Sequence, residues 1–243
     1  MKMHNSPYAF LSPLQRGKRG GAVQNIQDVI REAIVRLDLA PGTFIDKKAL
    51  CEQLGTSRFP VSEALGRLAD EGFVEVLPQH GTRVTRIDLA DCGEAMFIRR
   101  ALESDALRHI APRVDAALLA ELERNMQAQA AAMARDDRIA FHECDIALHD
   151  LLLDTLGFER VKTAVFAARA KLDRLRLFMC TPQRQASTFA EHRRIVEALA
   201  ARDGEAAGRA MEHHLNMVME ELTDFAADNP DAFAPGEKAT VAA

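Results

Sequence analysis

The feature that most constrains this chain is a change of hydrophobic period within residues 23–87. Over 23–37 apolar side chains recur at steps of three and four, which predicts a helix with one buried face. A second, short helix is expected over 46–54. Ser57 then occupies the N-cap position of a third helix, with Pro60 in its first turn, where a missing N–H costs nothing. Three short helices in succession are therefore predicted.

The hydrophobic period then falls from 3.6 to 2 residues. Residues 73–77 and 82–87 alternate apolar and polar side chains on either side of Pro78-Gln-His-Gly81, which predicts a two-stranded hairpin with a glycine-containing turn. Three helices followed by a hairpin are typical of a winged helix-turn-helix, whose second and third helices are joined here by the tight Gly55-Thr-Ser turn.

The remainder of the chain, to about Ala227, shows helical periodicity with short breaks and no credible strand. It predicts an all-α bundle of about six helices, so the fold class is mainly α. Four regions are expected: a flexible basic arm (1–21), a winged helix-turn-helix DNA-binding domain with a two-stranded wing (22–87), an all-helical effector- and metal-binding domain (88–228) and a disordered tail (229–243).

The composition excludes a membrane-spanning helix and a disulfide framework. No stretch approaches the roughly 18 apolar residues that a bilayer-spanning helix needs, and the first 21 residues lack the apolar core of a secretory signal. The four cysteines lie far apart, without a CxxC pair, which indicates buried, reduced thiols. We expect a cytoplasmic protein that has no membrane partner.

Charge is distributed unevenly along the chain. Residues 1–86 contain 12 Lys and Arg against 9 Asp and Glu, a net charge of +3, whereas residues 87–243 carry a net charge of −8. This asymmetry indicates that only the N-terminal part meets a polyanion. Together with the helix-turn-helix pattern, it makes double-stranded DNA the expected partner.

The third helix is the expected DNA-reading helix. Such a helix enters the major groove N-terminus first, so base-reading side chains belong in its opening turns and flanks. Arg58 suits a base contact because its guanidinium can pair bidentately with guanine, and Lys48 on the preceding helix suits a phosphate. The residues expected to contact DNA are Lys48, Ser57, Arg58, Ser62, Arg67, His80, Gly81, Thr82 and Arg83.

Four residues of the C-terminal part form a candidate metal site. Asp145 and His149 are one helical turn apart and project from one face, which suits two ligands on one ion. His192 and His214 lie on successive helices, and an antiparallel pair could bring them to the same level. Spacing alone leaves open that these are ordinary core or surface histidines. Nitrogen and oxygen donors would suit Zn, Ni or Mn.

Two sets of motifs resemble a known family. The run from Leu50 to Val74, followed by Pro78-Gln-His-Gly-Thr-Arg-Val, resembles the N-terminal domain of GntR-family transcription regulators. Four later runs fall in the order seen in the FCD ligand-binding domain of the FadR-like branch: 96–103, 145–149, 191–199 and 210–215. The resemblance departs at Ser62, where the commonest form has Arg, and at Gly66, often polar or basic in the family, so no operator sequence can be inferred.

The resemblance also implies site residues. In metal-containing members an Asp, a His four residues later and two further His bind a divalent cation; these match Asp145, His149, His192 and His214. Arg99 matches an Arg near the effector, where a guanidinium beside a metal would receive a small carboxylate. The alternative for Arg99 is an ion pair with Glu103. His142 and His213 do not match the motif and are interpreted as structural.

The function expected from these observations is that of a ligand-responsive regulator, a repressor that senses a small organic acid at a divalent metal. Two-fold symmetry would place a homodimer on a roughly palindromic operator. Two alternatives remain: a regulator for which the metal ion is itself the signal, and a metalloenzyme with an accessory DNA-binding head. An enzyme is disfavoured because the chain lacks HExxH and GxSxG motifs and an evident cysteine nucleophile.

Overall fold

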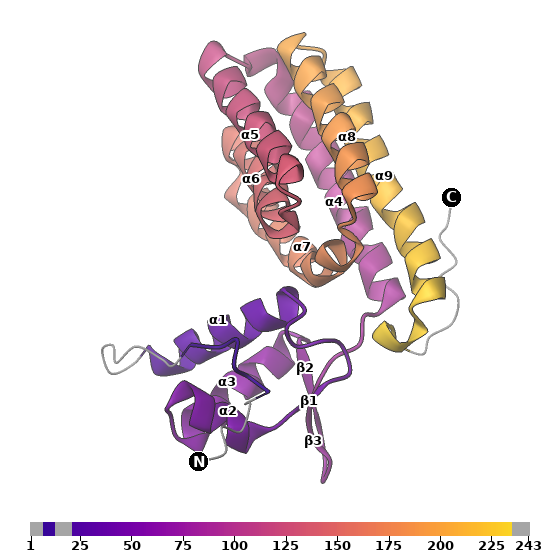
Figure 1. Cartoon of the computed structure of the whole chain (residues 1–243). Helices are drawn as coiled ribbons and strands as arrows, with labels where there is room; N and C mark the ends of the chain where they lie inside the picture. Colours follow the sequence, from indigo (N-terminus) through magenta and orange to yellow (C-terminus); the bar gives the residue numbers. More distant parts are fainter. Residues whose placement is uncertain (1–6, 13–20, 235–243) are drawn as a thin grey trace. The chain divides into compact units, whose positions relative to one another are not determined.

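The structure is a computed structural model that describes residues 7–12 and 21–234, apart from six side chains between positions 171 and 178. The chain divides into two compact units (Figure 1). The N-terminal unit contains the chain up to Ile87 and the segment that begins at Asn229, and the helical unit contains Asp88–Asp228.

The N-terminal unit is a winged helix-turn-helix, as the sequence predicts. Its elements are α1 (Ala22–Val35), β1 (Phe44–Ile45), α2 (Lys47–Leu54), α3 (Arg58–Asp70), β2 (Val74–Leu77) and β3 (Gly81–Val84). The antiparallel sheet has the order β1-β3-β2. It therefore has three strands, where the sequence predicts two, because the two residues of β1 are too few to show alternation.

Local sequence determines where α2 and α3 begin and end. The side chain of Asp46 accepts hydrogen bonds from the amides of Lys48 and Ala49 and so begins α2. Gly55, at φ 66°, ends α2 in the left-handed conformation that glycine adopts without strain. Ser57 occupies the N-cap position of α3, as predicted, although its side chain makes no capping hydrogen bond.

Part of the expected flexible arm is packed against the N-terminal unit. Tyr8 and Leu11 belong to its apolar core, and Tyr8 is only 2% exposed. The Tyr8 hydroxyl accepts a hydrogen bond from the amide of Asp46 (2.7 Å), and the side chain of Gln53 donates to the carbonyl of Leu11 (2.6 Å). Burial of the ring thus opposes the disorder expected for this segment. Residues 1–6 and 13–20 of the arm lie outside the described part.

The start of the expected disordered tail also has a defined structure. After the 3-10 turn η2 (Pro230–Ala232), Phe233 pairs in parallel with Ile87. The Ile87 amide donates to the carbonyl of Ala232 (3.0 Å), and the Ala234 amide donates to the carbonyl of Ile87 (2.8 Å). Phe233 is 5% exposed. Its burial and these hydrogen bonds order residues 229–234, whereas residues 235–243 lie outside the described part.

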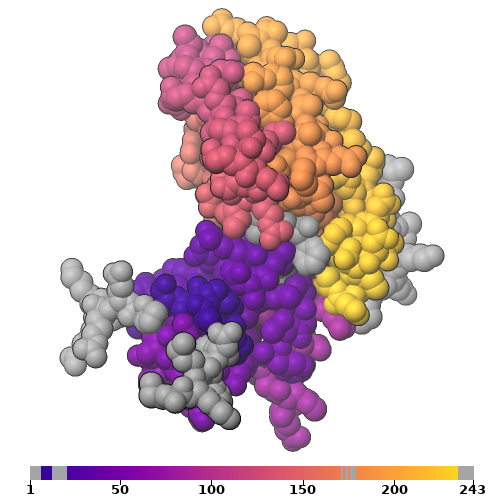
Figure 2. All heavy atoms as spheres, viewed as in Figure 1, coloured from indigo at the N-terminus to yellow at the C-terminus, as the bar shows by residue number. Residues whose placement is uncertain are grey.

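The helical unit has the six helices that the sequence predicts. They are α4 (Leu89–Ile110), α5 (Ala116–Ala134), α6 (Arg138–Leu156), α7 (Glu159–Met179), α8 (Pro182–Ala200) and α9 (Gly204–Asp228), with the 3-10 turn η1 (Ala111–Arg113) after α4. Helix α4 packs against α6, α7 and α9, and α8 packs against α5 and α9. On the face shown in Figure 2, the side chains of α5 and α8 meet and cover the centre of the unit.

Two expectations, on the cysteines and on membrane-spanning helices, can be compared with this fold. All four cysteines have free thiols; Cys51 and Cys92 are buried, as expected, whereas Cys144 and Cys180 are partly exposed. Among the helices of the described residues, none combines the length and apolarity that crossing a bilayer requires.

The pairing of Phe233 with Ile87 generates a prediction. In Phe233→Ala we expect the free energy for detaching residues 229–234 to fall by about 3 kcal/mol, because the ring leaves a cavity. Hydrogen–deuterium exchange at the Ile87 amide should then become faster. Asp231→Ala, which truncates an exposed side chain of the same segment, serves as the control. Equal exchange rates in Phe233→Ala and wild type would contradict the packing described here.

Candidate metal centre and nucleic-acid interface

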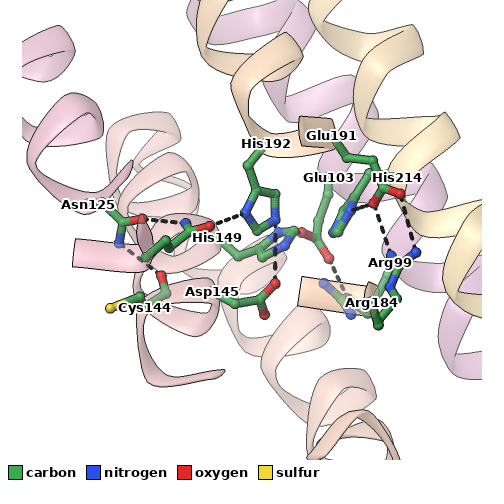
Figure 3. Close-up of polar contacts among 11 residues, drawn as sticks. Arg99, Glu103, Asn125, Cys144, Asp145, His149, Arg184, Glu191, His192 and His214 are labelled. Carbon is green, nitrogen blue, oxygen red and sulfur yellow. Dashed lines mark hydrogen bonds and ion pairs between the residues drawn. The ribbon is translucent and has the colours of Figure 1, made fainter. Parts of the chain in front are cut away.

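The helical unit brings together the four residues predicted as metal ligands (Figure 3). Asp145 and His149 come from α6, His192 from α8 and His214 from α9, and each is at most 1% exposed. One potential ligand atom of each residue lies within 4.8 Å of those of the other three. The Nε2 atom of His192, for example, is 3.4 Å from Oδ1 of Asp145.

Each imidazole is oriented by a hydrogen bond at its Nδ1 atom. His149 Nδ1 is 2.5 Å from Oε2 of Glu103, and His214 Nδ1 is 2.7 Å from Oε2 of Glu191. His192 Nδ1 is 2.9 Å from Oε1 of Gln129. An acceptor at Nδ1 holds the ring proton there, so the Nε2 lone pair is the one available to a metal ion.

The amide of Gln129 is itself held in the orientation that this role needs. Its Nε2 donates to Oδ1 of Asn125 (2.7 Å), whose own amide nitrogen donates to the carbonyl of Cys144 (2.8 Å). A backbone carbonyl can only accept, so it determines which atom donates and which accepts in each of these hydrogen bonds. Oε1 of Gln129 is therefore the atom left to accept from His192.

The carboxylate of Glu103 links His149 to a buried arginine. Arg99 Nε donates to Oε1 of Glu103 (2.6 Å), and both side chains are almost inaccessible to solvent. Burial alone would raise the pKa of Glu103, but the neighbouring charge of Arg99 and the hydrogen bond with His149 outweigh it and hold the pKa well below its ordinary value. Glu103 is therefore a buried carboxylate that stays ionised.

Arg99 has donors left over after this ion pair. Its two terminal nitrogens, Nη1 and Nη2, are buried and have no hydrogen-bond partner among the described residues. Leaving such donors unmatched costs free energy, so a buried guanidinium of this kind is suited to receive an anion. Arg99 thus forms the ion pair with Glu103 that is the alternative to an effector contact, and it also has two nitrogen donors that an effector could use.

Glu191 is held in the same way as Glu103. Arg184, in the first turn of α8, donates to both oxygens of Glu191 (3.2 and 3.0 Å) and to Glu221 on α9 (2.7 Å). Two arginine–glutamate pairs therefore each orient one imidazole: Arg99 and Glu103 orient His149, and Arg184 and Glu191 orient His214.

The donor set fits a divalent transition metal. Three imidazole nitrogens and one carboxylate are ligands that Zn, Ni and Mn accept. Ligands about 2.1 Å from a metal lie about 3.4 Å apart in a tetrahedral site and at most about 4.2 Å apart when they are opposite one another. Ligand atoms that lie within 4.8 Å of one another would therefore move closer together, by at most about 1.4 Å, when an ion binds. A cavity of about 30 Å³ adjoins Asp145, and its lining includes His142, Arg184, Gln185 and Thr188.

The structure places most of the predicted DNA-contacting residues on the surface of the N-terminal unit. Ser57, Arg58 and Ser62 are exposed on the first turns of α3, and Arg67 lies further along it, 3.6 Å from Glu63. The other exposed members of the predicted set are Lys48 on α2 and His80 and Gly81 at the wing turn.

Two wing residues differ from expectation. Thr82 is 1% exposed, because alternate residues of β3 face opposite sides and Thr82 faces the interior. Its side chain therefore faces away from solvent, so a contact of Thr82 with DNA would have to come from its backbone. Arg83 faces outward but is already engaged: its guanidinium forms an ion pair with Glu75 (2.8 Å) and lies over the ring of Phe44.

Sequence reasoning did not find the residues that orient the imidazoles. Glu103 follows Arg99 by one helical turn, which the sequence shows, but its contact with His149 joins positions 46 residues apart. Gln129 on α5 likewise contacts His192 on α8, and Glu191 on α8 contacts His214 on α9. No local pattern marks such partners.

Family models match both units. Residues 22–84 match the model described as bacterial regulatory proteins, gntR family, and residues 94–217 match the FCD domain. A regulator described as an HTH-type transcriptional regulator in an unstable DNA locus of Streptomyces ambofaciens is 35% identical over 84% of this chain and 86% of its own length. The HTH-type transcriptional repressor RspR of Escherichia coli K12 is 31% identical over 87% of this chain and 93% of its own.

Solved structures share the fold. McbR/YncC of E. coli aligns with a TM-score of 0.69 at 19% identity, over 84% of this chain and 98% of its own. A GntR regulator from Rhodococcus sp. RHA1 aligns with a TM-score of 0.71 at 22% identity, over 83% and 97% of the two chains. With the family matches, these findings make the chain a transcription regulator and not an enzyme: it belongs to the GntR family, with an N-terminal helix-turn-helix domain and a C-terminal FCD domain.

Proposed function

We propose that this protein is a repressor that binds a divalent metal ion and a small carboxylate in its FCD domain, and that the carboxylate changes its affinity for DNA. The observation that carries this proposal is the buried convergence of Asp145 with three histidines near an arginine that has unmatched donors. A purely structural core would gain nothing from burying these polar groups together.

The orientation of the imidazoles supports a resident metal at this cluster. Hydrogen bonds hold the Nδ1 atoms of His149, His192 and His214 away from the centre of the cluster. Histidine ligands in metal sites are held in this way by carboxylate or carbonyl oxygens. The metal, when bound, would supply positive charge and open coordination positions. The residues of the chain fix the direction of approach and exclude water.

The donors of Arg99 support a carboxylate as the effector. A planar guanidinium matches a carboxylate through two parallel hydrogen bonds, and Nη1 and Nη2 are available for them. For the ligand to act as a signal, it must bind the DNA-competent and DNA-incompetent states with different affinities.

Names of relatives support repression. The E. coli relative is named a transcriptional repressor, and a 30% identical protein of Paenarthrobacter nicotinovorans is named as a repressor of a D-xylose utilization operon. Because a repressor acts on chromosomal DNA, we propose a cytoplasmic location for this protein.

Homodimerisation would suit a palindromic operator, because two-fold protein symmetry matches two-fold DNA symmetry. The helical unit has apolar side chains that a second copy could cover. Phe97 and Ile98 of α4 are exposed, as are Phe158 before α7 and Phe166 within it. A self-complementary contact between two such faces would bury these rings.

His149→Ala tests the metal site. We expect loss of bound metal and of the effector response, because the variant removes one of four ligands. Metal content per chain is measured by mass spectrometry, with His213→Ala as the control, since His213 is exposed beside His214. Glu103→Gln should retain the ligands but bind metal about 10- to 100-fold more weakly. Wild-type metal content in His149→Ala would show that the ligand set is wrong.

Arg99→Lys tests the carboxylate site separately. Lysine keeps the charge beside Glu103 but lacks the planar fork, so we expect metal to stay bound while stabilisation by small carboxylates is lost. The readout is the rise in melting temperature when a library of small acids is added to the metal-loaded protein. Arg100→Lys, at the exposed neighbouring position, is the control. If metal alone altered DNA binding and no acid did, the ion itself would be the signal.

Arg58→Ala tests direct reading of DNA. We expect discrimination at one base pair per half-site to fall by about 1–3 kcal/mol, because a bidentate contact to guanine is lost. The measurement compares the affinities of single-base variants of a selected operator. Lys48→Ala should instead weaken binding to all sequences equally and reduce the salt dependence. An unchanged base preference in Arg58→Ala would remove Arg58 from the reading residues.

A further inference from the structure

The DNA-reading helix exposes an aromatic ring. Phe59, the second residue of α3, is 77% exposed, the highest value among the large apolar side chains described. The inner face of α3 is formed by Val61, Leu65 and other buried residues, whereas Phe59 lies on the outer face with Arg58 and Ser62. The ring therefore belongs to the surface that is expected to meet the major groove.

The fold of the N-terminal unit does not explain this ring. Phe59 lies outside the apolar core, and its exposure to water is unfavourable in the free protein. Because the opening turns of a recognition helix approach base edges, DNA binding would remove this ring from water. The free energy gained by burying the ring would then depend on which chemical groups of the DNA it contacts in the groove.

Only one group of a base pair suits a phenyl ring in the major groove. Phosphates are charged and hydrated, and most atoms of the base edges are hydrogen-bond donors or acceptors that phenylalanine cannot match. The exception is the C5-methyl group of thymine, which accepts apolar contacts.

We propose that Phe59 reads the methyl group of a thymine next to the base that Arg58 contacts. Phe59 is then a specificity-determining residue that acts through an apolar contact, whereas Arg58 acts through hydrogen bonds. This inference depends on the DNA-binding mode of α3 and is independent of the metal and the carboxylate effector.

Deoxyuridine provides a direct test, because it differs from thymidine only by the missing methyl group. The full-length wild-type protein selects an operator from a randomised duplex library, and each thymine is then replaced in turn. Dissociation constants are measured by fluorescence anisotropy at fixed salt. We expect one position per half-site at which deoxyuridine weakens wild-type binding about fourfold, the effect of one buried methyl group.

Variants assign that methyl effect to Phe59. Phe59→Ala should bind the thymine and deoxyuridine duplexes equally well, and Phe59→Leu, which keeps an apolar side chain, should retain a preference for thymine. Val76→Ala, which truncates an exposed apolar residue of β2, should keep the wild-type preference. Thermal unfolding of Phe59→Ala should match wild type because the ring is exposed.

Three outcomes would overturn the proposal. If Phe59→Ala weakened binding equally for every duplex, the ring would contact the sugar–phosphate backbone. Unchanged affinity in Phe59→Ala would place the ring outside the interface. A thymine preference that persisted undiminished in Phe59→Ala would assign the methyl contact to another residue.

Discussion

The helical unit depends on the hydrogen-bonded charges at its centre. Moving Arg99 and Glu103 out of water costs several kcal/mol per ion, and their mutual contact offsets this only when the geometry is good and the remaining polar atoms are matched. Glu103 meets that condition by using one oxygen for Arg99 and the other for His149. The contact of Glu103 with His149 thereby joins α4 to α6, and Arg184 and Glu191 join α8 to α9 in the same manner.

The N-terminal unit follows the opposite design, with an apolar interior and polar readers outside. One segment that the sequence assigns to a flexible arm completes that interior around Tyr8, and a second, from the expected disordered tail, pairs with Ile87 through Phe233. The second has a consequence for connectivity. The chain passes from one unit to the other at Asp88 and returns after Asp228, at the end of α9, the helix that carries His214. The unit that contains the candidate metal site is thus connected to the N-terminal unit by two covalent links.

How much of the fold and of the site the sequence predicts depends on how far apart in the sequence the interacting residues lie. Helix limits depend on nearby residues such as Asp88, Thr181 and Gly157, so the six helices were predictable from the sequence. Asp145 and His149 are also a local pair, one turn apart. Glu103 and Gln129 contact histidines far away in sequence, and no periodicity indicates which buried polar residue will meet which imidazole. Thr82 shows a second reason why the sequence predicts only part of the structure. Which side of the sheet a residue of a short strand faces depends on the register in which the strands pair.

The same long-range contacts decide whether metal and effector can act on one another. An anion held by Nη1 and Nη2 of Arg99 would compete with Glu103 for the charge of one guanidinium. Glu103 would then interact more strongly with the Nδ1 proton of His149, and the Nε2 atom that faces the cluster would become a more basic ligand. Three side chains in direct contact are sufficient for this coupling. By linkage, an anion that strengthens metal binding through them must itself bind more tightly when the metal is present.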